Sequence, residues 1–417
     1  MKELHRPLST RELILGKWIF IISIFLLGLP LTGVIPIPSG DTRESIEVSG
    51  AADAMQRNLG ATLIWLFIYC SAIFVLFSKF RKFYPVFSGR SVLYVLIAYI
   101  LLGSVWSPAP QKCFVDGFQL LGLCAVSIVG AVCYATQPVY LFKHVSLALS
   151  TNIALQLAAI LIFPDMTSHP NGRWAGMTGS ANYLGSLCIV GVWALSAWTS
   201  FFSDKYYFLK FILMAVFFAV LLGTNSVTSL AASSLMVFLF FFSLLFRGEK
   251  NVRSVRFLFF SLLLFFIVGA LFSFGLSNLL ELLGREENAS GRDVIWLSAL
   301  DLIQKNPIVG YGFGSDTESL GALHWATTFH NGYLEVWVKL GLIGVLMTCA
   351  ILWSYLRSAH AVKNVESSVV YKASIYFLVA FCIYNFTETG FYVARSPVWV
   401  FFVAMLFFTL AVKKERV

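Results

Sequence analysis

Between two long apolar runs, the chain reads Gly291-Arg292-Asp293-Val294-Ile295-Trp296, then Asn306-Pro307-Ile308-Val309-Gly310-Tyr311-Gly312-Phe313-Gly314, and then His330-Asn331-Gly332-Tyr333-Leu334-Glu335. Most of the remaining sequence is apolar. Of its 417 residues, 58% are hydrophobic and 12% are charged, whereas an ordinary soluble domain carries about 25% charge. A membrane protein that keeps an arginine, a histidine and a glycine-rich turn in one polar segment is expected to use them.

Apolar runs of about 20 residues recur along the whole chain, and each is long enough to cross a bilayer as a helix. We therefore predict an all-α polytopic membrane protein in which residues 1–417 form a single membrane domain. About twelve transmembrane helices are predicted. They cover residues 16–35, 59–78, 91–106, 113–134, 145–163, 180–201, 207–223, 228–246, 257–276, 331–355, 371–387 and 396–412.

The positions of lysine and arginine predict the orientation in the membrane. Most of the 30 basic residues fall in alternate connections, such as 79–90 and 247–256. Because short cytoplasmic loops carry an excess of these residues, both termini are predicted to be cytoplasmic. The long segment 277–329 is then periplasmic. Within it, the apolar spacing from Asp293 to Lys305 indicates a helix that ends before Asn306-Pro307.

Charge and cysteine content exclude several other functions. The net charge of +9 follows from the topology, since the basic residues are scattered among short loops, and it does not indicate a nucleic-acid partner. The seven cysteines lie in or beside apolar runs, and none forms a CxxC pair. We therefore predict no disulfide framework, no metal site and no cofactor.

The polar residues best suited to chemistry fall on the outer side of this topology. Each has an ordinary interpretation, because a loop arginine often contacts lipid headgroups and a histidine at a helix start often caps the helix. Their coincidence at one membrane depth predicts an active site. The candidates are Arg173, Asn182, Ser226, Thr228, Arg292, Tyr311, His330, Glu388 and Arg395.

Several motifs on this side occur in an order found in a known family. The most specific set is Gly291-Arg292, Trp296, Pro307 and Gly310-Tyr311-Gly312, followed by His330-Asn331-Gly332-Tyr333-Leu334-Glu335 and Leu340-Gly341-Leu342-Ile343-Gly344. Weaker signatures are Trp106-Ser107-Pro108, Arg173-Trp174-Ala175-Gly176, Asn182-Tyr183 and the turn at Ser226 and Thr228. Together they resemble the O-antigen polymerase and ligase superfamily, and most closely the Wzy-type exopolysaccharide polymerases. Relatives often place a basic residue where Val227 stands, so this turn departs from the pattern.

The resemblance implies a glycan transferase at the outer face of the bacterial inner membrane. It would polymerise oligosaccharide repeat units that are linked to undecaprenyl pyrophosphate. The implied partners are this lipid-linked donor, a glycan or lipid A core acceptor, membrane lipids, and a flippase or chain-length regulator.

The residue types suit such a transfer. A sugar on a lipid diphosphate is already activated, so the enzyme must hold the diphosphate leaving group and take a proton from the acceptor hydroxyl. Arginine binds phosphate through two charge-assisted hydrogen bonds, and histidine titrates near neutral pH. We assign Arg292, Arg173 and Arg395 to the diphosphate. His330 is assigned as the general base or as a group that orients the acceptor.

The other candidates are assigned to substrate binding, and they are Asn182, Ser226, Thr228, Tyr311 and Glu388. Glu388 is also the next candidate for the base. The outer side carries no DxD motif, which predicts a metal-independent enzyme.

Two alternative functions stay open. A ligase that moves lipid-linked glycan onto a lipid A core would share this chemistry and differ in its acceptor. A secondary transporter would place charges near the bilayer midplane and often carries inverted repeats. Here the predicted spans are almost free of charge apart from Glu335 and Lys339, and no repeat is visible.

Overall fold

A computed structural model describes residues 8–30, 59–201, 206–245, 292–323, 326, 328–363 and 368–415. The described residues form helices and connecting segments, and they contain no β-strand. The predicted all-α polytopic architecture is confirmed. The helices are α1 (Thr10–Phe25), α3 (Leu59–Ser78), α4 (Phe80–Phe87), α5 (Ser91–Leu102), α6 (Pro110–Tyr134), α7 (Pro138–Ile162), α8 (Pro164–Thr167), α9 (Ala181–Ser200), α10 (Tyr207–Thr224), α11 (Val227–Leu245), α13 (Arg292–Lys305), α14 (Gly332–Ala361), α15 (Ser368–Thr387) and α16 (Pro397–Lys414).

Within the described part of the chain, nine helical stretches are long and apolar enough to span a membrane. The spans predicted there coincide with helices, although α1 has only 16 residues and the apolar part of α11 covers only Val227–Ser243. The predicted span 257–276 and the end of the first one, 31–35, lie outside the described residues.

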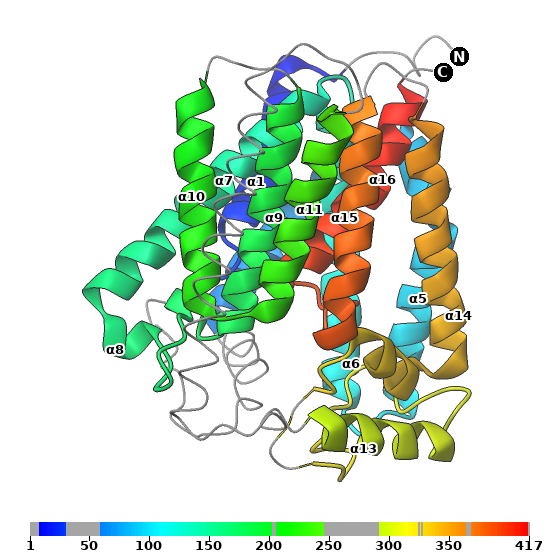
Figure 1. The fold of residues 1–417 in the computed structure, drawn as a ribbon. Helices are drawn as coiled ribbons and strands as arrows, with labels where there is room; N and C mark the ends of the chain where they lie inside the picture. The colour runs from blue at the N-terminus through cyan, green and yellow to red at the C-terminus, as the bar shows by residue number, and fades with distance from the viewer. Residues whose placement is uncertain are drawn as a thin grey trace.

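The long helices run side by side, and α13 lies across the end of the bundle opposite the carboxyl-terminal end of α16 (Figure 1). The spans α6, α9 and α16 are the most deeply buried, while α3 and α10 lie further out. The core between them is mainly aliphatic and contains aromatic contacts, such as Trp193 packed on Phe377 and Trp399 stacked on Phe402. The predicted helix between Asp293 and Lys305 is confirmed as α13.

Two features were not predicted from the sequence, and the first is the burial of Arg90. We placed Arg90 in the connection before the third predicted span, and the structure buries it there, with 6% of its surface exposed. Its guanidinium donates to the carbonyl of Leu406 and to the hydroxyls of Ser354 and Ser358. Because these acceptors take four hydrogen bonds from its five N–H groups, the buried cation can join α14 and α16.

The second difference is a break in α14, which was expected to be continuous. Gly341 has φ 62° and ψ −168°, so its backbone leaves the helical conformation. The segment 307–312 fills the break: the amides of Tyr311 and Gly312 donate to the carbonyls of Val338 and Lys339, at 3.0 and 2.8 Å. In return, the Leu342 amide donates to the Pro307 carbonyl at 2.8 Å.

The break fixes the position of α13. A Cβ atom on Gly341 would collide with the Ile308 carbonyl, so only glycine allows this close approach. The first turns of α14 then pack with α13 in a small separate core that includes Ile295, Ala299 and Val338. This arrangement brings Arg292, the first residue of α13, to the same end of the bundle as the start of α14.

Candidate active site

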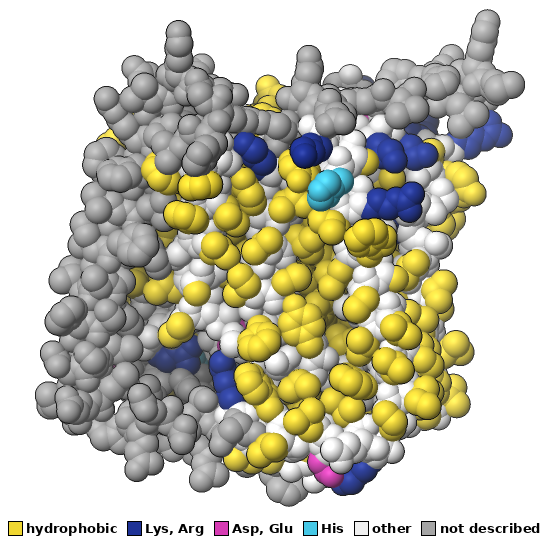
Figure 2. All heavy atoms as spheres, turned by 45° about the vertical axis from the view of Figure 1, so that its right-hand side comes forward, with side chains coloured by type: hydrophobic (Ala, Val, Ile, Leu, Met, Phe, Trp, Pro, Cys, Tyr) yellow, Lys and Arg dark blue, Asp and Glu magenta, His cyan; other side chains and the backbone are white. Residues whose placement is uncertain are grey.

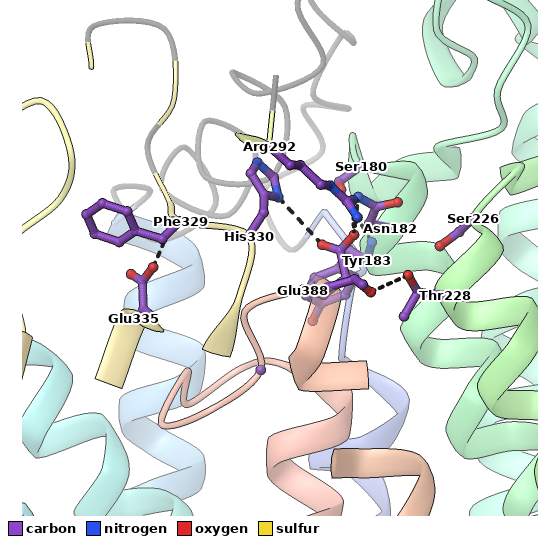
Figure 3. Close-up of polar contacts among 12 residues, drawn as sticks. Ser180, Asn182, Tyr183, Ser226, Thr228, Arg292, Phe329, His330, Glu335 and Glu388 are labelled. Atoms are coloured by element: carbon purple, nitrogen blue, oxygen red, sulfur yellow. Dashed lines mark hydrogen bonds and ion pairs between the residues drawn. The ribbon is translucent and has the colours of Figure 1, made fainter. Parts of the chain in front are cut away.

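Side chains from four helix ends meet at one end of the bundle (Figure 3). Asn182 lies in the first turn of α9, Thr228 in the first turn of α11, and His330 just before α14, while Glu388 follows the last residue of α15. Helix amino termini carry exposed amide groups and a partial positive charge. Three such termini around one region favour the binding of an anion.

Glu388 is the centre of this cluster, and only 3% of its side chain is exposed. One oxygen, Oε1, accepts hydrogen bonds from Arg292 Nη2 and from Asn182 Nδ2, both at 3.1 Å. The other oxygen, Oε2, lies 3.8 Å from Nδ1 of His330. The carboxylate thus connects α9, α13 and the start of α14, which are far apart in the sequence.

Arg173 supports the cluster from behind and is itself buried. Its Nη2 donates to Asn182 Oδ1 at 2.8 Å, and its Nε donates to the Thr224 carbonyl at 3.0 Å. Asn182 therefore accepts from Arg173 and donates to Glu388. These bonds fix the orientation of the Asn182 amide and place the charge of Arg173 behind the site.

His330 has an unusual backbone. Its φ of 47° lies in the left-handed region, which residues other than glycine rarely adopt. Its imidazole is buried, and Nδ1 has no hydrogen-bond partner among the described residues. The cap of α14 is supplied by the next residue, Asn331, whose Oδ1 accepts from the amides of Tyr333 and Leu334. The imidazole is therefore not needed as a cap.

Arg292 is the most accessible charged member of the cluster, with 32% of its side chain exposed. Its hydrogen bond to Glu388 uses Nη2, and a guanidinium has five N–H donors. Arg292 can thus stay paired with Glu388 while it presents further donors to a ligand.

The turn between α10 and α11 forms one wall of the cluster. The hydroxyl oxygens of Thr228 and Thr387 are 2.5 Å apart, which joins the start of α11 to the residue before Glu388. Ser226 donates to the hydroxyl of Ser229 at 3.0 Å. Val227, between these two residues, is 73% exposed.

Two predicted site residues make their contacts elsewhere. The guanidinium of Arg395 packs over the ring of Trp65 on α3, 5.5 Å from its centroid, and burial lowers its pKa. The Tyr183 hydroxyl donates to the Arg395 carbonyl at 2.7 Å. The hydroxyl of Tyr311 donates to the Leu302 carbonyl at 3.3 Å, so Tyr311 belongs to the small core of α13.

Glu335 and Lys339 were identified from the sequence only as charged residues within a predicted span, and the structure shows that they are paired. Glu335 and Lys339 form an ion pair of 2.5 Å, with side chains that are 4% and 12% exposed. Their spacing of four residues inside an apolar run was the available signal, because it places both side chains on one helix face. No group of three or more His, Cys, Asp or Glu side chains suited to a metal ion occurs among the described residues.

Comparison with known proteins gives one match. Residues 211–349 match the family model described as O-antigen ligase. The match covers Ser226, Thr228, Arg292 and His330, and leaves out Arg173, Asn182, Glu388 and Arg395. It is consistent with the O-antigen polymerase and ligase superfamily, so the predicted resemblance is confirmed. None of the curated proteins that were compared matches the chain. The match supports a membrane enzyme that handles glycans.

Proposed function

We propose that this membrane protein, in which residues 211–349 match the O-antigen ligase family, polymerises glycan repeat units that are linked to undecaprenyl pyrophosphate. The reaction would take place at the outer face of the bacterial inner membrane. The observation that carries the proposal is the cluster in which Glu388 contacts Arg292, Asn182 and His330. It combines an accessible cation for a diphosphate with a buried histidine–carboxylate pair.

Arg292 is the proposed contact for the diphosphate. In the transfer, the acceptor oxygen forms a bond with the anomeric carbon while the bond from that carbon to the phosphate oxygen breaks. Negative charge grows on the departing diphosphate, and a planar guanidinium stabilises it through paired hydrogen bonds. The amino termini of α9, α11 and α14 add to the positive field at this point.

His330 is the proposed general base. A proton on Nδ1 would face Oε2 of Glu388, which leaves the lone pair of Nε2 free for the acceptor hydroxyl. When Nε2 takes the proton, the imidazolium gains the nearby carboxylate as a counter-charge. The present distance of 3.8 Å is longer than a hydrogen bond, and such pairs often tighten when substrate binds.

Arg173 and Asn182 are proposed to hold the carboxylate in place. Both side chains of this pair are already engaged, Arg173 with the Thr224 carbonyl and Asn182 with Glu388. We therefore propose that Arg173 acts mainly through its charge, and Asn182 through the orientation of Glu388, and not through direct contact with the diphosphate.

The ligase is the second candidate, because residues 211–349 match a family described as O-antigen ligase. The two reactions share a donor and differ in the acceptor. A transporter is disfavoured by the Glu335–Lys339 pair, whose charges neutralise each other in the first turns of α14 and do not form a transport path through the spans.

The test is a transfer assay with the purified protein in lipid nanodiscs and one defined undecaprenyl-pyrophosphate-linked repeat unit, with and without lipid A core. A polymerase forms lipid-linked products of two or more repeat units without the core. A ligase forms product only when the core is present. Absence of product in both reactions, with the protein folded, contradicts glycan transfer.

The orientation of the protein gives a separate prediction. Lys and Arg side chains gather along the edge of the apolar surface that lies opposite α13 (Figure 2). The site would then face the periplasm. In a background that lacks the seven native cysteines, we expect Glu318→Cys to react with a membrane-impermeant maleimide on intact spheroplasts. Its matched partner, Ser88→Cys, is exposed, lies in the connection before α5 that is predicted to be cytoplasmic, and should react only after permeabilisation. The reverse labelling pattern would place the site in the cytoplasm.

A further inference from the structure

The buried ion pair of Glu335 and Lys339 holds the backbone of the segment that carries His330. Glu335 Oε2 accepts a hydrogen bond from the amide of Phe329 at 2.9 Å, and Oε1 pairs with Lys339. Figure 3 shows Glu335 below the Phe329 amide, on the side of the segment away from Glu388. The carboxylate thus binds the residue directly before His330 and does not approach the diphosphate site.

The backbone at His330 needs such support. A φ of 47° is costly for a residue with a Cβ atom, and it persists only where the surroundings hold it. On one side of His330, the Phe329 amide is held by Glu335. On the other side, the Gly332 amide donates to the Glu388 carbonyl at 3.0 Å. The left-handed residue is therefore fixed between two hydrogen bonds.

Lys339 stabilises the Glu335 carboxylate at this buried position. An unpaired carboxylate with 4% exposure would be strongly disfavoured, whereas one paired with a cation can remain charged and accept from the amide. Lys339 also lies over the ring of Phe313, 5.3 Å from its centroid, and its carbonyl accepts from the Gly312 amide. The pair therefore links the segment before His330 to the loop that fills the break in α14.

We propose that Glu335 is a positioning residue, paired with Lys339, that sets the place of the His330 imidazole relative to Glu388. The proposal rests on the proposed function of His330. It adds the requirement that the His330 imidazole be held in the correct place relative to Glu388. Ionisable residues within a predicted span are rare and commonly functional. Here the required feature is a hydrogen-bond acceptor for the Phe329 amide, and the negative charge is needed only because Lys339 is present.

Two double variants separate the need for a hydrogen-bond acceptor at position 335 from the need for a negative charge there. Glu335→Gln/Lys339→Met removes both charges and keeps an acceptor for the Phe329 amide. Glu335→Leu/Lys339→Met removes the same charges and also removes the acceptor. Both are neutral and similar in volume to the native pair, and buried ion pairs are often replaced by apolar residues without loss of folding. Thermal stability and membrane abundance are measured for both.

In the transfer assay we expect the Gln/Met variant to keep kcat within about threefold of the wild type. The Leu/Met variant should lose at least about tenfold in kcat with little change in the KM for the donor, because a displaced base loses reactivity while the diphosphate site stays intact. Equal kcat in the two variants overturns the positioning role. If both are inactive, the ion pair is required whether or not the acceptor is kept; if both are fully active, the hydrogen bond is dispensable.

A second measurement does not depend on activity. The rate at which diethyl pyrocarbonate modifies His330 is followed by peptide mass spectrometry. It should be low in the wild type and in Gln/Met, and several-fold higher in Leu/Met, because the unheld segment opens locally. If this pattern holds while no form of the protein transfers glycan, the positioning role stands and the proposed function fails. If glycan is transferred but His330 is equally protected in both variants, the positioning role fails and the proposed function stands.

Discussion

Replacing His330 with asparagine is expected to lower the rate of glycan transfer by about 10²–10⁴-fold, the usual loss when a general base is removed. Asparagine is a suitable substitute because it tolerates the left-handed backbone better than most residues, so the φ of 47° can be kept. Its side chain cannot accept a proton near neutral pH. The cap of α14 is unaffected, since Asn331 supplies it. Activity should therefore fall while thermal stability stays close to that of the wild type.

The same substitution at His360 is a matched control. His360 lies on the same helix, near its carboxyl-terminal end, and is exposed. His360→Asn should leave both kcat and membrane abundance near wild type. If His330→Asn also retains normal turnover, His330 does not take the proton. Glu388 would then be the next candidate for the base, through its carboxylate at the centre of the cluster.

Arg292→Lys is expected to cost about 10²-fold in kcat, comparable to the loss of one donor that stabilises charge in a transition state. Lysine keeps a positive charge near the buried carboxylate of Glu388, so the cluster is not left with an unpaired charge. It replaces the planar fork of arginine by a single ammonium group, which cannot make the paired contact with a diphosphate. The loss therefore reports geometry and not net charge.

The measurement is kcat and donor KM in the transfer assay, together with the length of the glycan made in cells. Lys305→Arg is the matched control, because it exchanges the same two residue types at the exposed carboxyl-terminal end of α13. It should change kcat less than about twofold, as is usual for surface positions. Glycan of normal length in cells that carry Arg292→Lys would show that Arg292 serves a less demanding purpose, such as a lipid headgroup contact.

The sequence predicts the candidate residues as a set at one membrane depth, but it does not predict which of them contact one another. Arg292, His330, Asn182 and Glu388 are joined by contacts that span up to 206 positions of sequence separation. Arg395 and Tyr311 share the same predicted depth, yet Arg395 packs on Trp65 and Tyr311 on the core of α13. Depth follows from where apolar runs end, whereas lateral position depends on which helices pack together.

The residue that caps α14 is another feature that the sequence leaves open and the structure determines. The sequence His330-Asn331-Gly332 at the start of a predicted helix leaves open which side chain caps it. The structure places Asn331 Oδ1 on the amides of Tyr333 and Leu334 and turns the imidazole of His330 toward Glu388. That choice depends on the left-handed backbone of His330, which Glu335 and Glu388 hold by hydrogen bonds on either side.

By itself, the sequence determined that this protein is a polytopic helical membrane protein, where most of its helices lie, and that α13 ends before Asn306-Pro307. These features are local, because an apolar run of sufficient length must become a helix in lipid and a proline before a glycine-rich stretch ends one. The tertiary structure alone decided the break in α14 at Gly341, the burial of Arg90 and the convergence on Glu388. Each of these depends on hydrogen bonds between segments distant in the chain, and no local pattern of residues encodes which segments will meet.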